Sequence, residues 1–260
     1  MKRVSLVNVA LLALVGGVWP AAVAAQPAYN WNGFYVGANL GGAAGGSDHA
    51  SIVSGPSDYF FPTDLSDINS ASKQNLATTG ITGGIQGGYN YMLGNVLLGA
   101  ELDFNAFPQS GSSNPTVGYT CCAGFGSDNF FNVRTTVSTD WLLTARPRLG
   151  YAVGQFLPYV TGGLAVTNLS AKFRFTDASQ SAQERAQASA IKPGWTAGFG
   201  LEVGVTQNWT IKAEYLYVKF GKIFATGVMS VPENAPTSVL FSNYADLHSN
   251  IGRVGLNYKF

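Results

Sequence analysis

The end of the chain alternates between apolar and polar residues. Apolar side chains occupy every second position there, with glycine, asparagine or lysine between them: Val254, Leu256, Tyr258 and Phe260. A period of two indicates a β-strand with one apolar and one polar face. The same alternation recurs in seven other segments. The pattern therefore predicts eight strands, at residues 31–42, 81–92, 96–107, 139–153, 156–167, 195–205, 209–220 and 250–260.

The connections between the predicted strands are alternately short and long. Turn-forming residues fill the short ones, at 93–95, 154–155 and 206–208, whereas the others run over roughly 25–40 residues. Strict short and long alternation is typical of outer-membrane barrels. We therefore expect an all-β fold: an eight-stranded antiparallel up-and-down transmembrane β-barrel with short periplasmic turns and four long extracellular loops. Residues 182–190, in the third long loop, have the composition of a short helix.

The two faces of the predicted strands differ in charge. Apolar residues share one parity, which would face lipid, and the charged residues share the other. Eight strands enclose a space that side chains just fill, and isolated charges there would be costly, so the inward charges should pair. Five are acidic and five are basic. They form a predicted lumen charge network: Glu101, Asp103, Asp140, Arg146, Arg148, Glu202, Lys212, Glu214, Arg253 and Lys259.

Aromatic residues provide a second indication of a membrane barrel, because Trp and Tyr concentrate at the two membrane interfaces. Trp141 and Trp195 fall at the outer ends of predicted strands. A larger group falls at the periplasmic ends: Trp31, Tyr91, Tyr151, Trp209, Tyr258 and Phe260. A secreted soluble β-sandwich, whose core would take the apolar parity, is the alternative. It explains neither the two aromatic levels nor the alternating connections.

The N-terminus has the layout of a cleaved secretory signal peptide. Lys2 and Arg3 precede an apolar run at residues 9–18 and small residues at 21–25. We therefore expect a signal peptide at 1–25 and one barrel domain at 26–260, located in the cell outer membrane. Removal of the signal leaves 13 basic and 14 acidic residues. Without a basic field, nucleic acid is excluded as a partner.

Several strand motifs resemble a known family. WNGFYVG at 31–37, GGIQGGYN at 83–90 and LGAELDF at 98–104 are similar to the small outer-membrane β-barrel, porin-family surface proteins of Gram-negative bacteria. So are YVTGGLA at 159–165, GWTAG at 194–198, and residues 209–221 and 254–260. The resemblance covers all eight predicted strands and none of the long loops.

The resemblance implies how the barrel reaches the membrane. The outer-membrane assembly machinery inserts such barrels, and a terminal aromatic residue on an alternating last strand is its recognition signal. Phe260, with Tyr258 and Leu256, fits that assembly signal. A membrane-interface aromatic is the simpler reading of Phe260, and the two roles are compatible.

Reactive side chains are few and poorly spaced for chemistry. His49 and His248 have no ligand-spaced partner, so a zinc or haem site joining them is disfavoured and no metal or cofactor is expected. Asp246 and Ser249 flank His248 with the side-chain types of a triad, but proximity in sequence is not triad geometry, and we expect no enzyme.

Two adjacent cysteines, Cys121 and Cys122, lie in the second long loop. In an exported protein, thiols tend to oxidise. A vicinal disulfide is favoured, although neighbouring Cα atoms about 3.8 Å apart would strain it. Free thiols and pairing between molecules remain alternatives.

The expected function is that of a structural, surface-exposed outer-membrane protein that supports envelope integrity. Its partners would be outer-membrane lipid and lipopolysaccharide, the assembly machinery, and host or surface ligands bound through the loops. The alternative is a narrow porin for ions or small solutes, which the family resemblance suggests. A ligand-binding or adhesive receptor would be a specialised form of the first.

Overall fold

The computed structural model describes residues 29–54, 60–120, 129–178, 182–231 and 239–260. The predicted signal peptide and the Cys121–Cys122 pair lie outside the described residues. The chain forms one helix and nine strands within the described part: β1 Gly33–Ser54, α1 Pro62–Ala71, β2 Gln74–Leu93, β3 Val96–Ser113, β4 Thr116–Gly118, β5 Phe130–Tyr151, β6 Phe156–Asp177, β7 Gln183–Gly204, β8 Trp209–Val228 and β9 Leu240–Lys259.

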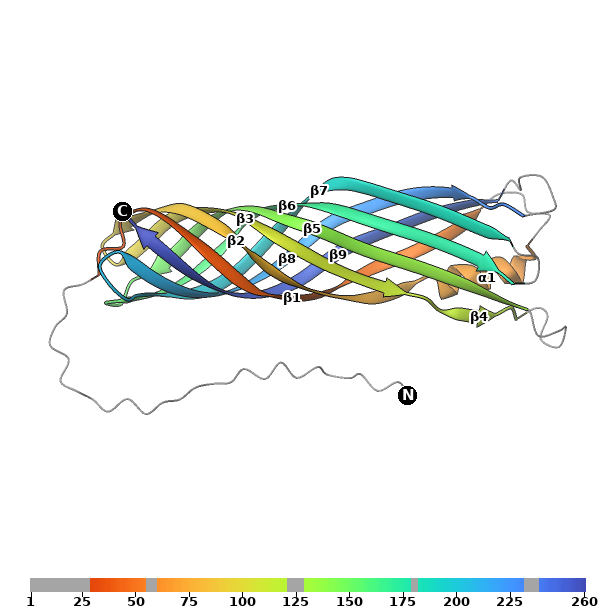
Figure 1. Ribbon diagram of the computed structural model, residues 1–260, viewed down its shortest axis with the longest axis horizontal. Helices are drawn as coiled ribbons and strands as arrows, with labels where there is room; N and C mark the ends of the chain where they lie inside the picture. The colour runs from red at the N-terminus through yellow and green to blue at the C-terminus, as the bar shows by residue number, and fades with distance from the viewer. Residues whose placement is uncertain (1–28, 55–59, 121–128, 179–181, 232–238) are drawn as a thin grey trace, which may run out of the picture.

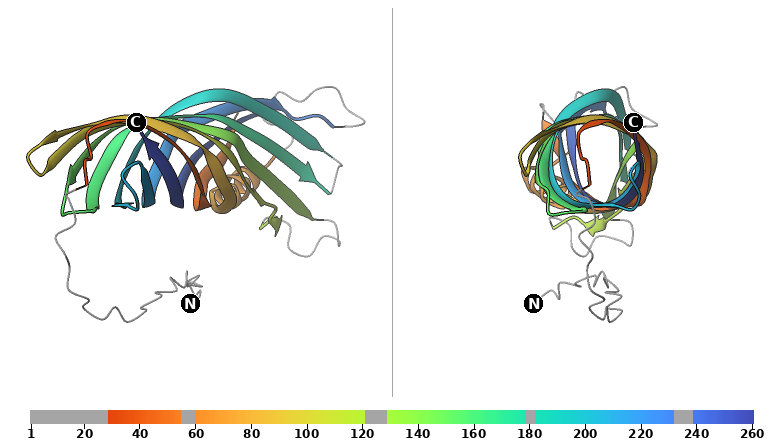
Figure 2. Two further views of the ribbon diagram at one scale, coloured as in Figure 1. Left: turned by 60° about the vertical axis from the view of Figure 1, so that its left-hand side comes forward. Right: turned by 90° about the vertical axis from the view of Figure 1, so that its left-hand side faces the viewer.

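Eight long antiparallel strands close into a barrel (Figures 1 and 2). Their order is β3-β2-β1-β9-β8-β7-β6-β5, and pairing of β3 with β5 completes the ring. The short strand β4 adds to the edge of β5. The predicted fold class is therefore confirmed. In the described chain, no helix is long and apolar enough to cross a membrane.

The predicted tight turns lie at the end of the barrel that carries the C-terminus (Figure 1). Two of them contain a glycine with positive φ, Gly94 at 63° and Gly154 at 60°. Such a conformation is available to glycine at little steric cost, so these turns reverse the chain within a few residues. By the expected topology, this end is periplasmic and the end that carries α1 is extracellular.

The strands are 18 to 22 residues long, much longer than predicted. Most residues expected in long loops therefore belong to strands that continue beyond the membrane. Between β6 and β7 only residues 178–182 remain as a connection, whereas residues 55–73 between β1 and β2 include α1. Residues 182–190, expected as a short helix, enter β7 instead.

The strands were predicted too short because the apolar residues change from the outward face to the inward face partway along strands such as β6. In the first half of β6 the outward side chains are apolar, as at Val160 and Leu164, which are 55% and 67% exposed. In its second half the outward side chains are polar, as at Lys172, whereas the inward Phe173 is buried. The strand keeps its parity while the apolar set moves from the outside to the inside. We call the outward-facing apolar zone the lipid-facing belt and the strand ends beyond it the extracellular extension.

Glycine allows the strands to lie close where the barrel wall curves. A Cβ atom on Gly41 would lie 2.7 Å from the Cα of Arg253 on β9, and one on Gly84 would lie 2.6 Å from the Cα of Asn105 on β3. Neither contact is sterically acceptable. In contrast, a Cβ on the neighbouring Gly42 would meet nothing within 4 Å. These glycines therefore have a structural role in a narrow barrel.

The part of the wall that the structure describes has a seam in the extracellular extension, between β7 and β8. The β7–β8 ladder runs from Gly204↔Thr210 to Gly194↔Phe220, and beyond it the two strands meet again only at the isolated bridge Gln183↔Ser230. The buried side chain of Glu184 fills part of the seam, because a Cβ on Gly227 would overlap its carboxylate.

Candidate functional site: the filled lumen

The lumen is the natural candidate for a functional site, because a pore or a binding cavity would lie there. Inward side chains instead fill it in successive layers along the axis. The first layer, at the periplasmic end, is apolar and contains the buried Trp31, Leu97 and Leu157. Trp31, predicted as a membrane-interface aromatic, is therefore a lumen residue, and its indole Nε1 donates to the Gly154 carbonyl at 3.4 Å.

Above this layer lies a charged layer built from five strands. Each strand places its charges two residues apart or singly on the inward face, as at Glu101 and Asp103 on β3. Four carboxylates and four cations meet, so the formal charges balance. The members are Glu101, Asp103, Arg146, Arg148, Glu202, Lys212, Glu214 and Arg253.

Arg146 is the centre of the charged layer. Its Nη2 lies 2.6 Å from Glu101 Oε1 and 2.8 Å from Asp103 Oδ2, and its Nη1 lies 3.1 Å from Glu214 Oε1. All four side chains have no exposed area. Removing such charges from water is expensive, and it is offset only when each finds close partners. The layer is therefore stable as a complete set.

The other cations link strands across the lumen. Lys212 Nζ on β8 lies 2.8 Å from Glu101 Oε1 on β3, and Arg253 Nη2 on β9 lies 2.6 Å from Glu214 Oε2. Arg148 Nη2 on β5 lies 2.6 Å from Glu202 Oε2 on β7. These contacts join strands that are not neighbours in the ring as well as adjacent ones, so the layer braces the barrel from within.

Two tyrosines that the sequence analysis missed belong to the charged layer. The Tyr35 hydroxyl donates to Glu101 Oε2 at 2.7 Å and accepts from Arg148 Nη1 at 2.6 Å. The Tyr159 hydroxyl donates to Glu214 Oε1 at 2.9 Å, and its ring centroid lies 4.1 Å from the Arg148 guanidinium carbon. In the sequence, both tyrosines have the parity opposite to the apolar residues of their strand, as the charged residues do. This parity could have identified them as lumen residues.

Two of the ten predicted network residues are elsewhere. Asp140 is exposed, because β5 has a register shift between Thr139 and Leu142, so that neither Asp140 nor Trp141 between them faces the lumen. A bulge reverses parity locally, which alternation alone does not reveal. Lys259 lies at the periplasmic rim, where its Nζ donates to the Asn30 carbonyl at 2.5 Å. The prediction was wrong for both residues.

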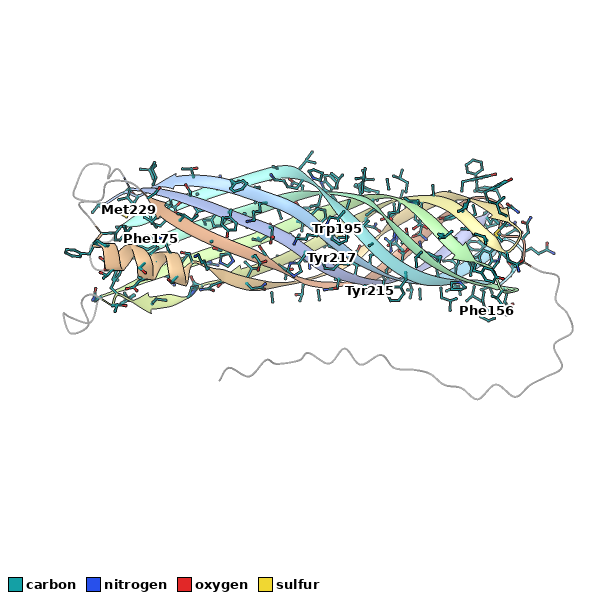
Figure 3. All side chains as sticks on the ribbon, turned by 180° about the vertical axis from the view of Figure 1, so that it is seen from behind. Phe156, Phe175, Trp195, Tyr215, Tyr217 and Met229 are labelled. Atoms are coloured by element: carbon teal, nitrogen blue, oxygen red, sulfur yellow. The ribbon has the colours of Figure 1, made fainter. Side chains whose placement is uncertain are left out.

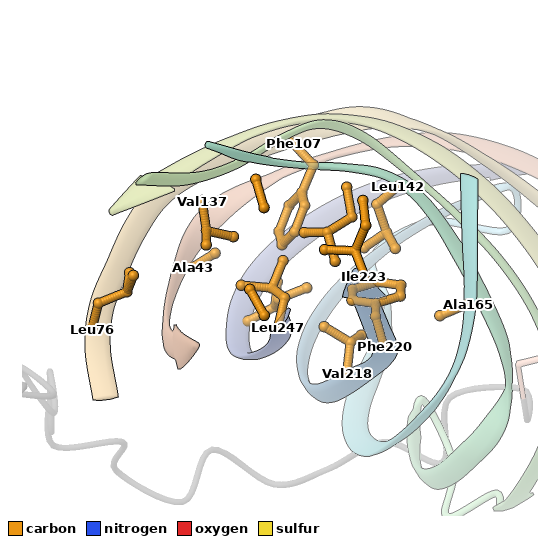
Figure 4. Close-up of a cluster of buried hydrophobic side chains, with 14 of the residues drawn as sticks. Ala43, Leu76, Phe107, Val137, Leu142, Ala165, Val218, Phe220, Ile223 and Leu247 are labelled. Carbon is orange, nitrogen blue, oxygen red and sulfur yellow. The ribbon is translucent and has the colours of Figure 1, made fainter. Parts of the chain in front are cut away.

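An apolar layer follows immediately above the charges. The next inward positions are Leu216 on β8 and Ile251 on β9, and Leu142 on β5 follows beyond Thr144, whose hydroxyl donates to Asp103; the three apolar side chains are each at most 1% exposed. With Phe107, Phe220 and their neighbours they form one buried cluster inside the ring (Figure 4). These apolar side chains occupy the lumen above the charged layer, together with buried polar side chains such as Thr139 and Gln109.

The extracellular mouth is closed by aromatic side chains and α1. Ile68 of α1 is fully buried and packs in a cluster with inward-facing Phe131, Phe175 and Phe241. Phe175 and Met229, another member, lie at the α1 end of the barrel (Figure 3). Asp67 accepts from the backbone N of Thr120 at 2.8 Å, which joins the helix to the end of β4.

The residues considered for metal binding or catalysis point in different directions. His49 is buried, whereas His248 lies on the outer face of β9 and stacks on Tyr217 at 6.4 Å between centroids. Asp246 accepts from the backbone N of Asp48, and Ser249 accepts from Gln109. In the described chain, no group of three or more His, Cys, Asp or Glu residues is arranged to hold a metal ion.

The predicted assembly signal lies on the outside of the barrel. Leu256, Tyr258 and Phe260 are 47%, 36% and 72% exposed. Tyr258 also forms an edge contact with Trp209, at 5.2 Å between centroids. This places an aromatic cluster at the periplasmic edge of the lipid-facing belt.

Comparison with known proteins agrees with this architecture. The sequence matches the outer membrane protein beta-barrel domain over residues 10–260. It is 31% identical over 271 positions to the 31 kDa outer-membrane immunogenic protein of Brucella melitensis, covering all of both chains. It is 26% identical to the 22 kDa outer membrane protein of Rhizobium leguminosarum, over 75% of this chain and 67% of that one.

Solved structures of other barrels show weaker similarity. The outer membrane protein OprG of Pseudomonas aeruginosa is 14% identical, with a TM-score of 0.44, over 88% of this chain and 96% of that one. The family match spans nearly the whole chain, and the eight-stranded ring of this protein has a lipid-facing belt. The protein is therefore located in the outer membrane, and the chain belongs to the outer membrane protein beta-barrel domain family.

Proposed function

We propose that this protein is a structural, surface-exposed barrel of the outer membrane, and neither a pore nor an enzyme. It supports envelope integrity through the barrel and meets lipopolysaccharide and external ligands through its extracellular extension. The observation that carries the proposal is the filled lumen. Apolar layers lie on both sides of the charged layer, and α1 packs into the mouth.

The extracellular extension supports the surface role. Its strands continue well past the lipid-facing belt, and the outward residues of β6 and β7 there are mainly polar, as at Lys172 and Gln187. The relative in Brucella melitensis is described as an outer-membrane immunogenic protein, in line with a surface position. A long rigid extension presents its wall and loop tips outside the membrane, where recognition residues usually reside.

Planar bilayer recording on the purified, refolded chain tests the closed lumen. We expect no steady conductance, because water would have to cross the layer that contains Leu142, Leu216 and Ile251. A general porin refolded in the same way is the positive control. Steady conductance by the unmodified monomer would refute the proposal and support the alternative, a narrow porin for ions or small solutes.

A deletion strain tests the envelope role. We expect it to become more sensitive to detergents and to bulky antibiotics, because a structural component of the outer membrane is missing. Expression of the closed wild-type barrel should restore resistance. Unchanged sensitivity, with the protein verified as abundant in the parent strain, would contradict a role in envelope integrity.

A further inference from the structure

Three arginines form a row across adjacent strands on the outer wall of the extracellular extension. Arg134 on β5 is directly opposite Arg174 on β6, and Arg174 is directly opposite Arg185 on β7. All three are exposed and share the outward parity. Phe175, which follows Arg174, marks the level of this arginine row near the α1 end (Figure 3).

Like charges that face each other across a ladder destabilise a sheet. A fourth cation, Lys172, is exposed on the same face two residues closer to the membrane. The carboxylates nearest in sequence, Asp177 and Glu184, are buried on the inward parity. Within the described residues, no acidic side chain in register balances the repulsion within the row. An external anion would remove it.

The geometry of the row indicates a ligand with several anionic groups. Adjacent strands lie about 4.8 Å apart, so three guanidinium groups line a span of about 10 Å. Each guanidinium presents a fork of donors suited to phosphate or carboxylate. Hydroxyl and amide groups surround the row, including Thr136, Thr176 and Gln187. Such side chains suit a phosphorylated saccharide better than a single inorganic ion.

The position of the row identifies the source of that ligand. On β7, Ile191 is 66% exposed and lies near the outer edge of the lipid-facing belt, six residues from Arg185. Six residues extend about 20 Å along a strand, or about 15 Å above the membrane after tilt. The row faces sideways from the wall at this height. The neighbouring material there is the saccharide layer of lipopolysaccharide, above its lipid phosphates.

We propose that the row of Arg134, Arg174 and Arg185 binds anionic groups in the core saccharide of lipopolysaccharide in the same leaflet. This inference rests on the proposed surface role and assigns one partner to a defined site. Binding would anchor the extracellular extension laterally in the saccharide layer. Because the contacts are exposed, they should weaken as salt increases.

The test measures binding of lipid-free core oligosaccharide to the detergent-folded full chain by calorimetry. One sample retains its phosphate groups and another is chemically stripped of them. The variant is Arg134→Gln/Arg174→Gln/Arg185→Gln. A charge-matched control changes exposed cations outside the row, Lys73→Gln/Lys219→Gln/Lys222→Gln. Heat-modifiable mobility in gels verifies that each barrel is folded.

We expect the row variant to bind phosphorylated core about tenfold or more weakly, from three exposed charged contacts. The control variant should bind phosphorylated core with an affinity within about threefold of wild type. Wild type should bind the stripped core as weakly as the row variant binds the phosphorylated core. The site would be overturned if the row variant bound phosphorylated core as tightly as wild type does, or if the control variant lost as much affinity as the row variant. Heparin binding through the row without core binding would overturn the assigned partner. Bilayer conductance is independent of these outcomes, so failure of the closed-lumen proposal is recognised separately.

Discussion

Removing one cation from the charged layer tests whether that layer braces the barrel. Arg148→Met retains most of the apolar volume of the side chain but deletes the guanidinium that lies 2.6 Å from Glu202 Oε2. Glu202 then keeps only neutral donors, Thr210 and Asn257. Its carboxylate is left buried in the lumen without its ion pair, although Lys212 remains directly opposite on β8.

Typical values for buried ion pairs give the expected magnitudes. Loss of one partner from a buried pair typically costs about 3–5 kcal/mol of unfolding free energy, and we expect that range for Arg148→Met. Glu202→Gln should cost less, about 1–3 kcal/mol, because Arg148 still contacts Glu101 and Tyr35. The double variant restores equal numbers of charges. Its loss should be about 1–3 kcal/mol smaller than the sum of the two single losses.

Unfolding by urea in lipid vesicles, followed by tryptophan fluorescence and by heat-modifiable mobility in gels, measures these values. Lys219→Met, at an exposed position on β8, is the control and should change stability by less than about 0.5 kcal/mol. Strictly additive losses in the double variant would refute the idea that the two charges compensate each other. A loss below about 1 kcal/mol for Arg148→Met would show that water or other groups replace the guanidinium.

Three further predictions address other parts of the chain. Burial raises the pKa of Glu184, in the extracellular extension, from 4.5 to about 7. Because the folded state has the higher pKa, stability measured as the urea midpoint should fall as pH rises from about 4.5 to 7, and Glu184→Gln should flatten this profile. Parallel pH profiles of the variant and the wild type would contradict the assignment. Gly41→Val should prevent or strongly impair folding in a vesicle refolding assay. Gly42→Val should refold normally, because a Cβ there meets nothing within 4 Å. Equal refolding yields of the two variants would argue against close approach of β1 and β9. Deletion of Phe260 should reduce the heat-modifiable barrel in isolated outer membranes, while Phe260→Tyr should retain it; full insertion of the shortened chain would exclude an assembly signal there.

Alternation and turn residues alone determined the membrane barrel. Lipid favours apolar side chains at outward positions, so strands such as 209–220 were evident from their period of two. Glycine in the short turns fixed where neighbouring strands reverse, as at Gly94. The same parity placed eight of the ten expected charges in the lumen, because the alternative was to expose them to hydrocarbon.

Local alternation did not reveal the length of the barrel wall. Beyond the membrane, water replaces lipid outside, and the apolar set moves to the inward face, as at Phe173 and Phe175. The strands predicted from outward apolar residues therefore ended at the edge of the lipid-facing belt. Trp31 was misplaced for a related reason, since the sequence does not distinguish an aromatic that closes the lumen from one that faces lipid.

Only the closed ring decided which charges pair. Lys212 on β8 and Glu101 on β3 are distant in the sequence and lie on strands that do not pair, yet their atoms are 2.8 Å apart because the lumen is narrow. The bulge in β5 that excludes Asp140, and the row formed by Arg134, Arg174 and Arg185, also depend on strand register. Register and lumen width arise when the last strand closes on the first, so they are properties of the whole barrel and no single segment encodes them.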